Sequence, residues 1–529
     1  MNAVLPPDPN AAVGPNHVIA MCNLTFQIFD KTGASLFGPA NNNTLWSGFG
    51  GACETSNSGD PVVLYDKLAD RYLLSQFTAT SSPYMECIAV STSGDPTGSY
   101  YRYAFSTGNN FPDYPKAGVW PDAYYFSTRE FAGGVTFVGV GAYALNRAQA
   151  VAGNPNPQLI SFLVPPIGGG ANVGDGLLPS DLDGPTLPPT GSPNFYMGSQ
   201  DNNASYGATT DALNLYRFHA DFGTPANSTF TLAATIPSAA FNSILSLCGA
   251  GRACIPQPAT SVKLDHQGYR QRPLFRLAYR NFGDHESLVT NQSVSAGSGP
   301  NGEVSGIRWW EVRNPNGTPT IFQEGTYAPG LTDGIHRWMG SAAMDGQGNM
   351  ALGFSASNGN NPSVFPSVWY TGRLASDPLG TLPQGEGSII DGTGSQTSTL
   401  NRWGDYTSLT IDPTDDQTFW YCNEWVPVTG NSGWVIRIGS FKIATGGGGD
   451  INLTATARAR GNKAKVTLSW DPADGGDINV LRDGNVVQTT ADDGSTQDKL
   501  RNASGSTFTY QVCETDSGDC SNEVQVMIP

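Results

Sequence analysis

The sequence predicts an all-β protein, with a seven-bladed β-propeller followed by a small β-sandwich. Three observations lead to this prediction. A hairpin pattern (apolar stretch, acidic turn, second apolar or aromatic stretch) recurs at spacings of roughly 50–80 residues, which suit propeller blades. Turn-forming residues are abundant, with 64 Gly and 37 Pro among 529 residues. After residue 450 the pattern changes to short strands at a spacing of about ten residues, which is typical of a small sandwich.

The hairpin pattern occurs in clear and in weaker copies along residues 1–445. The clear copies are VVLYDKLADRYLLSQF (62–77), AGVWPDAYYFSTREF (117–131), SVKLDHQGYRQRPLFRLAYRN (261–281), SAAMDGQGNMALGFSASN (341–358) and SLTIDPTDDQTFWYCNEW (408–425), and the weaker ones are VGPNHVIAMCN (13–23) and LPPTGSPNFYMGSQDNN (187–203). A second strand pair follows most copies through turns such as DPTG and NPNG, which predicts four-stranded blades. The last repeat lacks a fourth strand, which the N-terminus could supply, and six or eight blades remain an alternative count.

Composition divides the chain into three parts. Residues 1–445 carry the repeats and form the predicted propeller. Residues 446–450, with the sequence GGGGD, form a flexible linker. Residues 451–529 contain short strands such as KAKVTLSW and TFTYQVCE, and they predict the sandwich, with Trp470 and Tyr510 in its core.

The charge and hydropathy of the chain exclude several classes of partner. Charged residues make up 14% of the chain and the net charge is −17, which argues against nucleic acid because phosphates require a basic surface. No apolar run approaches the roughly 18 residues of a membrane-spanning helix. The first ten residues, MNAVLPPDPN, lack the basic segment and apolar core of a signal peptide. We expect a monomer without nucleic-acid partner or membrane span.

Eight cysteines, an even number, predict a set of disulfides. Two pairs flank short turns, a third joins neighbouring segments, and the fourth would clasp the first repeat to the last. The predicted pairs are Cys513–Cys520, Cys248–Cys254, Cys53–Cys87 and Cys22–Cys422. Because disulfides persist in oxidising compartments, we expect a secreted, extracellular protein.

The repeat pattern predicts where polar residues converge. In a propeller, residues just before the first strand of each blade and just after the second strand meet around one mouth of the central channel. Many of the ionisable residues of this weakly charged chain fall at those positions. The catalytic candidates are Asp60, Asp113, Arg337, Arg402, Asp405 and Tyr406, and the substrate-binding candidates are Arg280, His285, Glu286, His336, Trp338, Trp403 and Glu424.

Three chemistries could use this mouth. Guanidinium groups suit the carboxylate or sulfate of an acidic glycan, with Asp60 or Asp113 as general acid and Tyr406 or Glu424 as nucleophile or base. Asp60, Asp113, Asp181 and Asp405 could instead hold a calcium ion, which prefers oxygen ligands. The third possibility is adhesion without chemistry. Singly, each residue also has a structural explanation, since Asp caps turns and Trp packs between sheets, and the opposite face remains an alternative binding surface.

Two segments carry a family resemblance. HRWMGSAAMDGQGNMAL and WGDYTSLTIDP resemble the sialidase-like propellers with short Asp-box repeats, although SAAMDGQGNMAL has one extra residue and no Thr-Trp. That resemblance implies a propeller with arginines and a Tyr/Glu pair at the ring mouth. Residues 8–445 as a whole resemble a group of secreted bacterial proteins, which implies fold and secretion. Residues 451–529 resemble a fibronectin type III module, which implies a spacer without a catalytic role.

These observations favour a carbohydrate-directed protein that binds a glycan or another polymer at the channel mouth. The leading hypothesis is a glycoside hydrolase or polysaccharide lyase, because acids, arginines and aromatic residues converge there. The alternative is a non-catalytic adhesin or scaffold that binds glycan, protein or calcium. Apart from calcium, the sequence predicts no cofactor.

Overall fold

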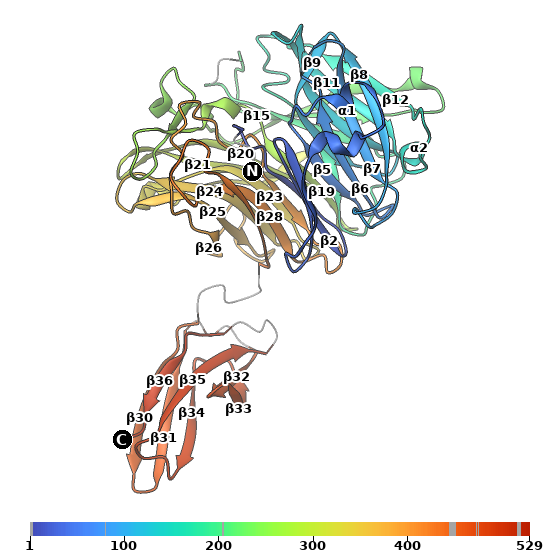
Figure 1. Ribbon diagram of the computed structural model, residues 1–529. Coiled ribbons are helices and arrows are strands. Elements are labelled where there is room, and N and C mark those ends of the chain that lie inside the picture. The colour runs from blue at the N-terminus through green and yellow to red at the C-terminus, as the bar shows by residue number, and fades with distance from the viewer. Residues whose placement is uncertain are drawn as a thin grey trace. The chain divides into compact units, whose positions relative to one another are not determined.

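The computed structural model is all-β and divides into two compact units, Met1–Lys442 and Ile443–Pro529 (Figure 1). It describes residues 4–79, 81–203, 206–443, 451–471, 473, 476–515 and 520–529. The predicted linker at 446–450 lies outside these residues.

The first unit contains antiparallel strands in consecutive groups. The first three sheets are β1 (Asn10–Val13), β2 (His17–Cys22), β3 (Thr25–Asp30) and β4 (Ser35–Asn41); β5 (Val62–Asp66), β6 (Arg71–Phe77), β7 (Tyr84–Ser91) and β8 (Tyr100–Gly108); and β9 (Asn110–Val119), β10 (Ala123–Ala132), β11 (Thr136–Asn146) and β12 (Leu159–Val164). Short helices occupy connections between the strands: η1 (Asn42–Trp46), α1 (Gly51–Thr55), α2 (Arg147–Val151), η2 (Pro225–Asn227) and α3 (Gly330–Asp333).

The later groups follow the same order along the chain. They are β13 (Leu178–Asp183), β14 (Asn194–Gln200), β15 (Ala212–His219) and β16 (Thr229–Pro237); β19 (Leu274–Asn281), β20 (Glu286–Gly299), β21 (Gly302–Arg313) and β22 (Thr320–Tyr327); β23 (His336–Met344), β24 (Met350–Asn358), β25 (Val364–Arg373) and β26 (Glu386–Ile390); and β27 (Ser408–Ile411), β28 (Phe419–Trp425) and β29 (Val435–Phe441). Parallel pairing of β13 with β19 joins two groups into one eight-stranded sheet.

The first strands of the groups form a closed ring. Each contacts the next in the order β1, β5, β9, β13, β19, β23 and β27, and β27 contacts β1. These strands and their second strands are buried, whereas outer strands such as β4 and β16 are largely exposed. Continuous apolar runs therefore mark the strands nearest the ring axis, because each sheet packs between two neighbours.

Side-chain and backbone hydrogen bonds close the ring at the N-terminus. The Ala11 amide donates to Ser408 Oγ at 2.9 Å, and the Asp8 amide donates to the Gly404 carbonyl at 3.1 Å. The N-terminal strand β1 pairs with β2, and the last group has three strands among the described residues. The expectation that the N-terminus supplies a fourth strand to the last repeat is therefore wrong.

In the structure, the fifth repeat begins later in the chain than the sequence predicts. The predicted hairpin places its first strand at 261–265, but the first strand of that sheet is β19 and the second is β20. Residues 238–270 instead form an inserted segment, which we call the cap. It contains η3 (Ser246–Cys248), β17 (Ala253–Ile255), β18 (Leu264–Asp265) and η4 (Gln267–Tyr269). In the fourth repeat the first strand is β13, so Asp181 lies within a strand and not ahead of it.

The second unit contains two sheets that share a hydrophobic core. The strands are β30 (Thr454–Arg460), β31 (Lys463–Ser469) and β34 (Ser495–Arg501) in one sheet, and β33 (Asn485–Ala491), β32 (Asp477–Arg482), β35 (Thr507–Glu514) and β36 (Val524–Met527) in the other. Trp470 and Tyr510 lie in this core, as the sequence predicts.

Three predicted disulfides form, Cys53–Cys87, Cys248–Cys254 and Cys513–Cys520. The predicted Cys22–Cys422 bond does not: both are buried free thiols. Burial raises the pKa of both groups, and the Sγ of Cys22 lies 3.3 Å from Thr25 Oγ1. The two thiols are thus packed in a form that resists ionisation, which disfavours oxidation. Among the described helices none is long and apolar enough to cross a membrane.

Candidate functional site

The first strands of the ring start at one face, and strained backbone gathers there. We call this face the start mouth. Residues just ahead of a first strand, or at a bulge within it, adopt left-handed backbone angles in most repeats: Asp8 (φ 50°), Asp60 (39°), Tyr114 (56°), Gln271 (52°), Met339 (53°) and Asp405 (67°). The fourth repeat has glycines at this position. Such conformations cost roughly 1–3 kcal/mol each and concentrate at functional sites.

Two aspartates from neighbouring repeats form a carboxyl pair at the start mouth. The carboxyl groups of Asp8 and Asp60 are close enough to shift each other's pKa. Asn23 holds both, because its Nδ2 donates to Asp8 Oδ2 at 2.7 Å and its Oδ1 accepts from the Asp60 amide at 2.9 Å. Burial, with repulsion from Asp113, raises the pKa of Asp60 to about 7, and burial with repulsion from Asp60 raises that of Asp8 well above its usual range. The pair therefore retains a proton near neutral pH.

Two tyrosines and a lysine pack against this pair. The Tyr406 hydroxyl donates to Asp60 Oδ2 at 3.2 Å, and the Tyr114 hydroxyl donates to the Asp405 carbonyl at 2.8 Å. The Nζ of Lys116 lies 3.1 and 3.3 Å from the two ring centroids. Burial, with the nearby Arg272, lowers the pKa of Lys116 well below its usual range. Lys116 is thus a candidate neutral amine at the mouth.

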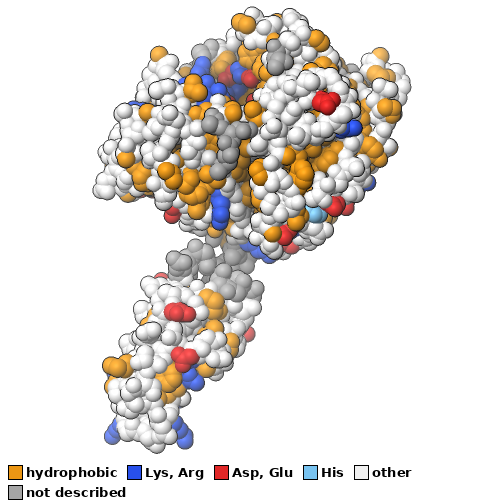
Figure 2. Space-filling model, viewed as in Figure 1, with side chains coloured by type: hydrophobic (Ala, Val, Ile, Leu, Met, Phe, Trp, Pro, Cys, Tyr) orange, Lys and Arg blue, Asp and Glu red, His pale blue; other side chains and the backbone are white. Residues whose placement is uncertain are grey.

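Guanidinium groups surround the acids. Arg129 bridges Asp113 and Asp175, at 3.0 Å from each, and Arg402 forms a close ion pair with Asp405. The side chains of Asp113 and Arg402 are 31% and 26% exposed, so solutes can reach this part of the mouth. Figure 2 shows one face of the molecule, on which charged side chains are sparse.

Arg272 is buried with its guanidinium carbon 4.0 Å from the centre of the Tyr114 ring. Its Nε and Nη1 have no hydrogen-bond partner among the described residues. The Oδ1 atoms of Asp8 and Asp405 are likewise buried without a partner. Buried polar atoms normally find partners, so unpaired donors and acceptors here indicate a place where solvent or a ligand binds.

The mouth brings together five of the predicted catalytic residues, Asp60, Asp113, Arg402, Asp405 and Tyr406. Arg337 does not join them. Its guanidinium is buried and binds Asp333 at 2.8 Å and Glu386 at 2.5 Å. Its predicted catalytic role is therefore wrong, because both carboxylates occupy the donors that a substrate would need.

Several predicted substrate-binding residues hold the cap instead. Trp338 and Trp403 are fully buried and pack against cap residues such as Leu245 and Tyr269, so they cannot form walls of an open site. Glu424 is also fully buried and accepts a hydrogen bond from the Gly404 amide. The predicted binding roles of the two tryptophans are therefore wrong. That of Glu424 stays a prediction, because burial and repulsion from Asp405 raise its pKa and its Oε2 has no partner among the described residues.

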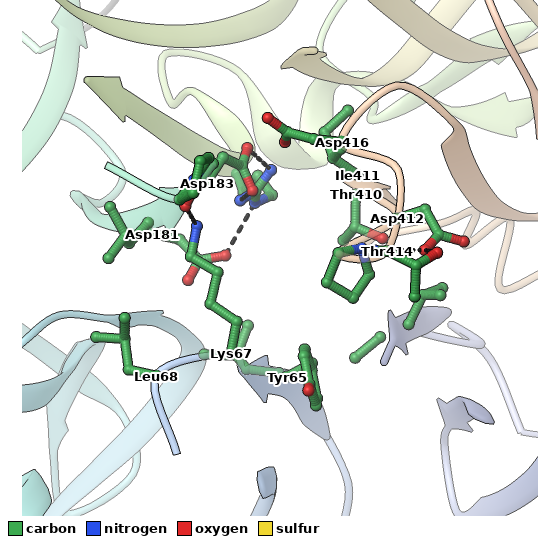
Figure 3. A pocket seen from close by; sticks show the side chains of 18 of the residues that line it. Tyr65, Lys67, Leu68, Asp181, Asp183, Thr410, Ile411, Asp412, Thr414 and Asp416 are labelled. Carbon is green, nitrogen blue, oxygen red and sulfur yellow. Dashed lines mark hydrogen bonds and ion pairs between the residues drawn. The ribbon is translucent and has the colours of Figure 1, made fainter. Parts of the chain in front are cut away.

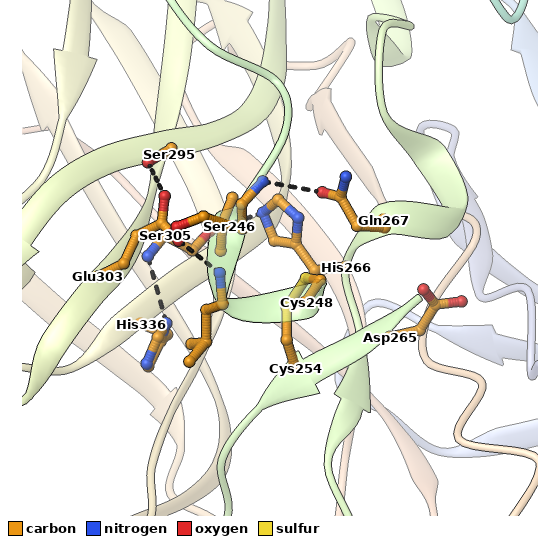
Figure 4. Close-up of a disulfide and its surroundings, with 12 residues drawn as sticks. Ser246, Cys248, Cys254, Asp265, His266, Gln267, Ser295, Glu303, Ser305 and His336 are labelled. Carbon is orange, nitrogen blue, oxygen red and sulfur yellow. Dashed lines mark hydrogen bonds between the residues drawn. A yellow bond between two sulfur atoms is a disulfide. The ribbon is translucent and has the colours of Figure 1, made fainter. Parts of the chain in front are cut away.

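His336 belongs to the same support (Figure 4). Its Nδ1 accepts from the Ser305 amide at 3.2 Å, and Ser305 Oγ lies 2.8 Å from Nε2 of cap residue His266. Burial lowers the pKa of His266 to about 4 and that of His336 to about 3. Both imidazoles are therefore neutral at physiological pH, and His336 secures the cap where the sequence predicts substrate binding.

Four predicted residues lie at the opposite end of the ring. Arg280 pairs with Asp416 at 2.7 Å, and Asp181 pairs with Arg276 at 2.9 Å. His285 and Glu286 belong to the β19–β20 turn and the strand after it. Their predicted place at the mouth is wrong because the first strands of the fourth and fifth repeats begin at other residues than the pattern suggests.

The predicted calcium quartet is consequently not assembled, since Asp181 is separated from Asp60, Asp113 and Asp405. Within the described ranges, no group of three or more His, Cys, Asp or Glu side chains is arranged to hold a metal ion.

Sequence reasoning missed Asp8 and Arg272 as site residues. A signal was present: Asp8-Pro9, Asp60-Pro61, Tyr114-Pro115 and Arg272-Pro273 repeat an X-Pro step at the start of a first strand. Proline fixes its own φ and restricts the preceding residue, so the step marks the strand start.

Comparisons with known proteins give distant likenesses. No protein-family model and no curated protein matches the chain. The chain is similar to the extracellular domain of a hybrid two-component system from B. thetaiotaomicron (12% identity, TM-score 0.34), and the match covers 100% of this chain but 56% of that one. It is also similar to a GH43_12 protein from a capybara gut metagenome (10%, TM-score 0.32, covering 98% and 88%). A Bombyx mori GH32 β-fructofuranosidase gives 9%, TM-score 0.30 and coverage of 79% and 86%. At these identities and scores the likenesses do not extend to activity.

Proposed function

We propose that this protein is a secreted carbohydrate-directed enzyme, a glycoside hydrolase that acts at the start mouth. The observation that carries the proposal is the Asp8–Asp60 pair, which keeps a proton near neutral pH beside the carboxylates of Asp113 and Asp405. Glycoside hydrolysis needs this combination. One carboxyl group must give a proton to the departing oxygen, while another, in its ionised form, acts as nucleophile or base.

Each residue then has a role. Asp60 donates its proton to the glycosidic oxygen as the bond to the anomeric carbon breaks. Asp405 acts as the ionised carboxylate toward that carbon, directly or through a water molecule, and its ion pair with Arg402 stabilises the negative charge. Tyr406 holds Asp60 through its hydroxyl, and burial with the negative charges of Asp113 and Asp405 keeps Asp60 protonated.

A second candidate function is a polysaccharide lyase, and Lys116 favours it. A neutral amine beside a buried guanidinium with unpaired donors could remove the proton next to the carboxylate of a uronic acid while Arg272 holds that carboxylate. The pair of electrons from the C–H bond would then form the new double bond as the C–O bond at the neighbouring carbon breaks. The departing oxygen would keep the C–O electrons and take a proton from the Asp8–Asp60 pair. Such a reaction yields an unsaturated sugar, which hydrolysis does not.

We keep calcium as a proposal for the start mouth, where Asp60, Asp113 and Asp405 remain of the predicted ligands, although these three side chains alone are not arranged as a ligand set. Carboxylate oxygens are the ligands that calcium prefers. A melting temperature that rises with calcium and falls with a chelator would support this ligand, and an unchanged melting temperature would exclude a tightly held ion.

For the architecture, we propose that the first unit is a seven-bladed β-propeller. The closed succession of first strands supports this count. We further propose that the second unit is a fibronectin type III-like sandwich that acts as a spacer. Disulfides support a secreted, extracellular location, since they are rare in reducing compartments.

The test is a panel of neutral and uronate-containing polysaccharides, with new reducing ends and ultraviolet-absorbing unsaturated products measured together. We expect new reducing ends without unsaturated product. Asp60→Asn should lower kcat/KM by about 10²–10⁴-fold, the range for loss of a general acid. Asp284→Asn is the matched control, because Asp284 is exposed in the β19–β20 turn at the other end of the ring.

Each other result has a definite meaning. Unsaturated product that disappears in Lys116→Met would favour the lyase. Binding without turnover of any polysaccharide in the panel would favour the alternative function, a non-catalytic adhesin. Activity that survives Asp60→Asn and Asp405→Asn would place the site elsewhere.

A further inference from the structure

A second concave site lies at the other end of the ring, where the first strands end. It is a cavity of about 450 Å³, lined by β1, β5, β13, β27 and the turns that follow them (Figure 3). Cavities of roughly 300–1,000 Å³ are typical of small-molecule sites. We call it the end pocket. Of the residues that the sequence predicts at the mouth, Asp181 alone lines it.

A buried ion-pair cluster lies on one side of the end pocket. Arg276, from β19, donates to Asp181 at 2.9 Å and to both oxygens of Asp183 at 2.8 and 2.6 Å. Arg276 is almost completely buried, and the two carboxylates lie on β13 within the pocket lining. The acids are thus held in fixed orientations, with lone pairs left over to accept further hydrogen bonds.

Lys67 reaches into the same pocket from the β5–β6 turn. In Figure 3 its side chain extends from beside Tyr65 toward Asp183. Its ammonium donates to the Gly184 carbonyl and forms no ion pair with a carboxylate in the described chain. An ammonium has three donors, so two remain for a ligand. Burial lowers the pKa of Lys67 to about 8, so the amine is mostly charged at neutral pH.

The opposite side carries acids that are already neutralised. Asp412 accepts from Lys31 at 2.7 Å, and Asp416 pairs with Arg280 at 2.7 Å. The pocket lining holds five carboxylates, Asp181, Asp183, Asp412, Asp415 and Asp416. They are matched in number by five cations, Arg276, Arg280, Lys31, Lys67 and Lys442, the last of which pairs with Asp415 at 3.3 Å. Despite its many charged groups, the pocket is close to electrically neutral.

Apolar side chains separate these groups. Val13, Val63, Leu182 and Ile411 all line the cavity, next to the hydroxyl-bearing Thr410. A purely apolar ligand would leave the spare donors of Lys67 and the carboxylate lone pairs without partners. An anion or a cation would bring an unbalanced charge into a partly buried site whose own charges already cancel.

We propose that the end pocket binds a neutral polyhydroxylated ligand of one or two sugar rings. Hydroxyl groups donate to the fixed carboxylates and accept from Lys67, while the C–H face of a ring packs on the apolar walls. This matching of donors, acceptors and apolar surface needs no net charge on the ligand. The site is independent of catalysis at the start mouth.

Ligand-observed NMR with probes of one ring skeleton tests the proposal. The probes are glucose, glucuronate and glucosamine, which are neutral, anionic and cationic near pH 6.5, with xylose and galactose as further neutral rings. We expect a neutral sugar to bind about tenfold more tightly than either charged derivative of glucose, a difference of about 1.4 kcal/mol.

Variants locate the binding. Lys67→Met should weaken the neutral sugar at least about tenfold and shift preference toward glucosamine, because the pocket then carries excess negative charge. Thr410→Val provides a second, nearly isosteric change in the lining. Lys263→Met is the matched control, since Lys263 is an exposed lysine of the cap. Asp60→Asn should leave this binding unchanged, which separates it from the start mouth.

The proposal is overturned if no neutral probe binds, if glucuronate or glucosamine binds best to the natural protein, or if Lys67→Met and Thr410→Val both leave binding unchanged while the circular dichroism spectrum shows native folding.

Discussion

The carboxyl groups at the two ends of the ring have opposite electrostatic surroundings. At the end pocket, Arg276 and its neighbours pair each carboxylate with a cation at 2.6–3.3 Å. At the start mouth, Asp8 and Asp60 face each other, and both carry pKa values raised by burial and by repulsion between acids. The same kind of side chain is thus fixed as an ionised acceptor at one end and held as a proton donor at the other.

The difference teaches that the count of acids at a ring mouth says little about function. Paired acids have no proton to give, but they can orient hydroxyl groups. Unpaired acids that share a proton are suited to acid–base chemistry, because their pKa lies near the working pH. The comparison therefore assigns binding to the end pocket and chemistry to the start mouth.

The largest expected effect comes from removing one cation of the ion-paired end pocket. Arg276→Met leaves Asp181 and Asp183 buried without their cation, and we expect a loss of about 3–5 kcal/mol in the free energy of unfolding. Urea unfolding at pH 7 measures it. Arg437→Met, on the exposed side of β29, should stay within about 0.5 kcal/mol of the natural protein.

A rescue variant sharpens this result. Adding Asp181→Asn and Asp183→Asn to Arg276→Met should recover part of the lost free energy, because the uncompensated charges are gone. If Arg276→Met alone costs no more than Arg437→Met, the end pocket is not held by its ion pairs.

At the start mouth we expect a substitution to raise the stability of the protein, not to lower it. The pKa of Asp60 is raised to about 7, so folding binds a proton between pH 4 and 7, and the contribution of Asp60 to stability falls as pH rises through that window. Asp60→Asn removes this penalty and should stabilise the protein at pH 8 by on the order of 1–2 kcal/mol, with little effect at pH 4.

Thermal unfolding of Asp60→Asn and the natural protein across pH 4–8 checks the sign. If the melting temperatures of the two proteins differ by the same amount at every pH, Asp60 is ionised throughout this range. The acid role proposed for it would then fail. Asp284→Asn again serves as control, because its carboxylate is exposed.

The sequence predicted the parts of the mouth where the repeat register was read correctly. Continuous apolar runs identified β5, β6, β27 and β28, and the acids ahead of β5 and β27 therefore came together as expected. Asp60, Asp405 and Tyr406 meet because closing a ring places the starts of all first strands at one face.

The remaining errors have two physical causes. SVKLD at 261–265 has the composition of a first strand, but the cap uses it in a short hairpin, which moved Arg280 to the wrong end. In the fourth repeat the pattern was read from residue 187, after the true first strand β13, and this misplaced Asp181. Burial also depends on what covers a segment, so Trp338 could not be recognised as part of the cap core from its position in the repeat. Asp8 was missed because the first hairpin copy starts after it.

The smallest expected effect concerns the cap, which covers part of the start mouth and not the end pocket. Burial lowers the pKa of His266 to about 4, so its contribution to stability is complete above about pH 6.5 and is lost as pH falls toward 4. His266→Gln keeps a donor for Ser305 without titrating. Its free energy of unfolding, relative to that of the natural protein, should rise by about 1 kcal/mol between pH 7 and 5.

Hydrogen exchange should show faster opening of residues 238–270 at pH 5 in the natural protein, with residues 413–416 at the end pocket unchanged. Equal acceleration at both ends would mean that acid loosens the whole ring, and the two ends would then not be independent.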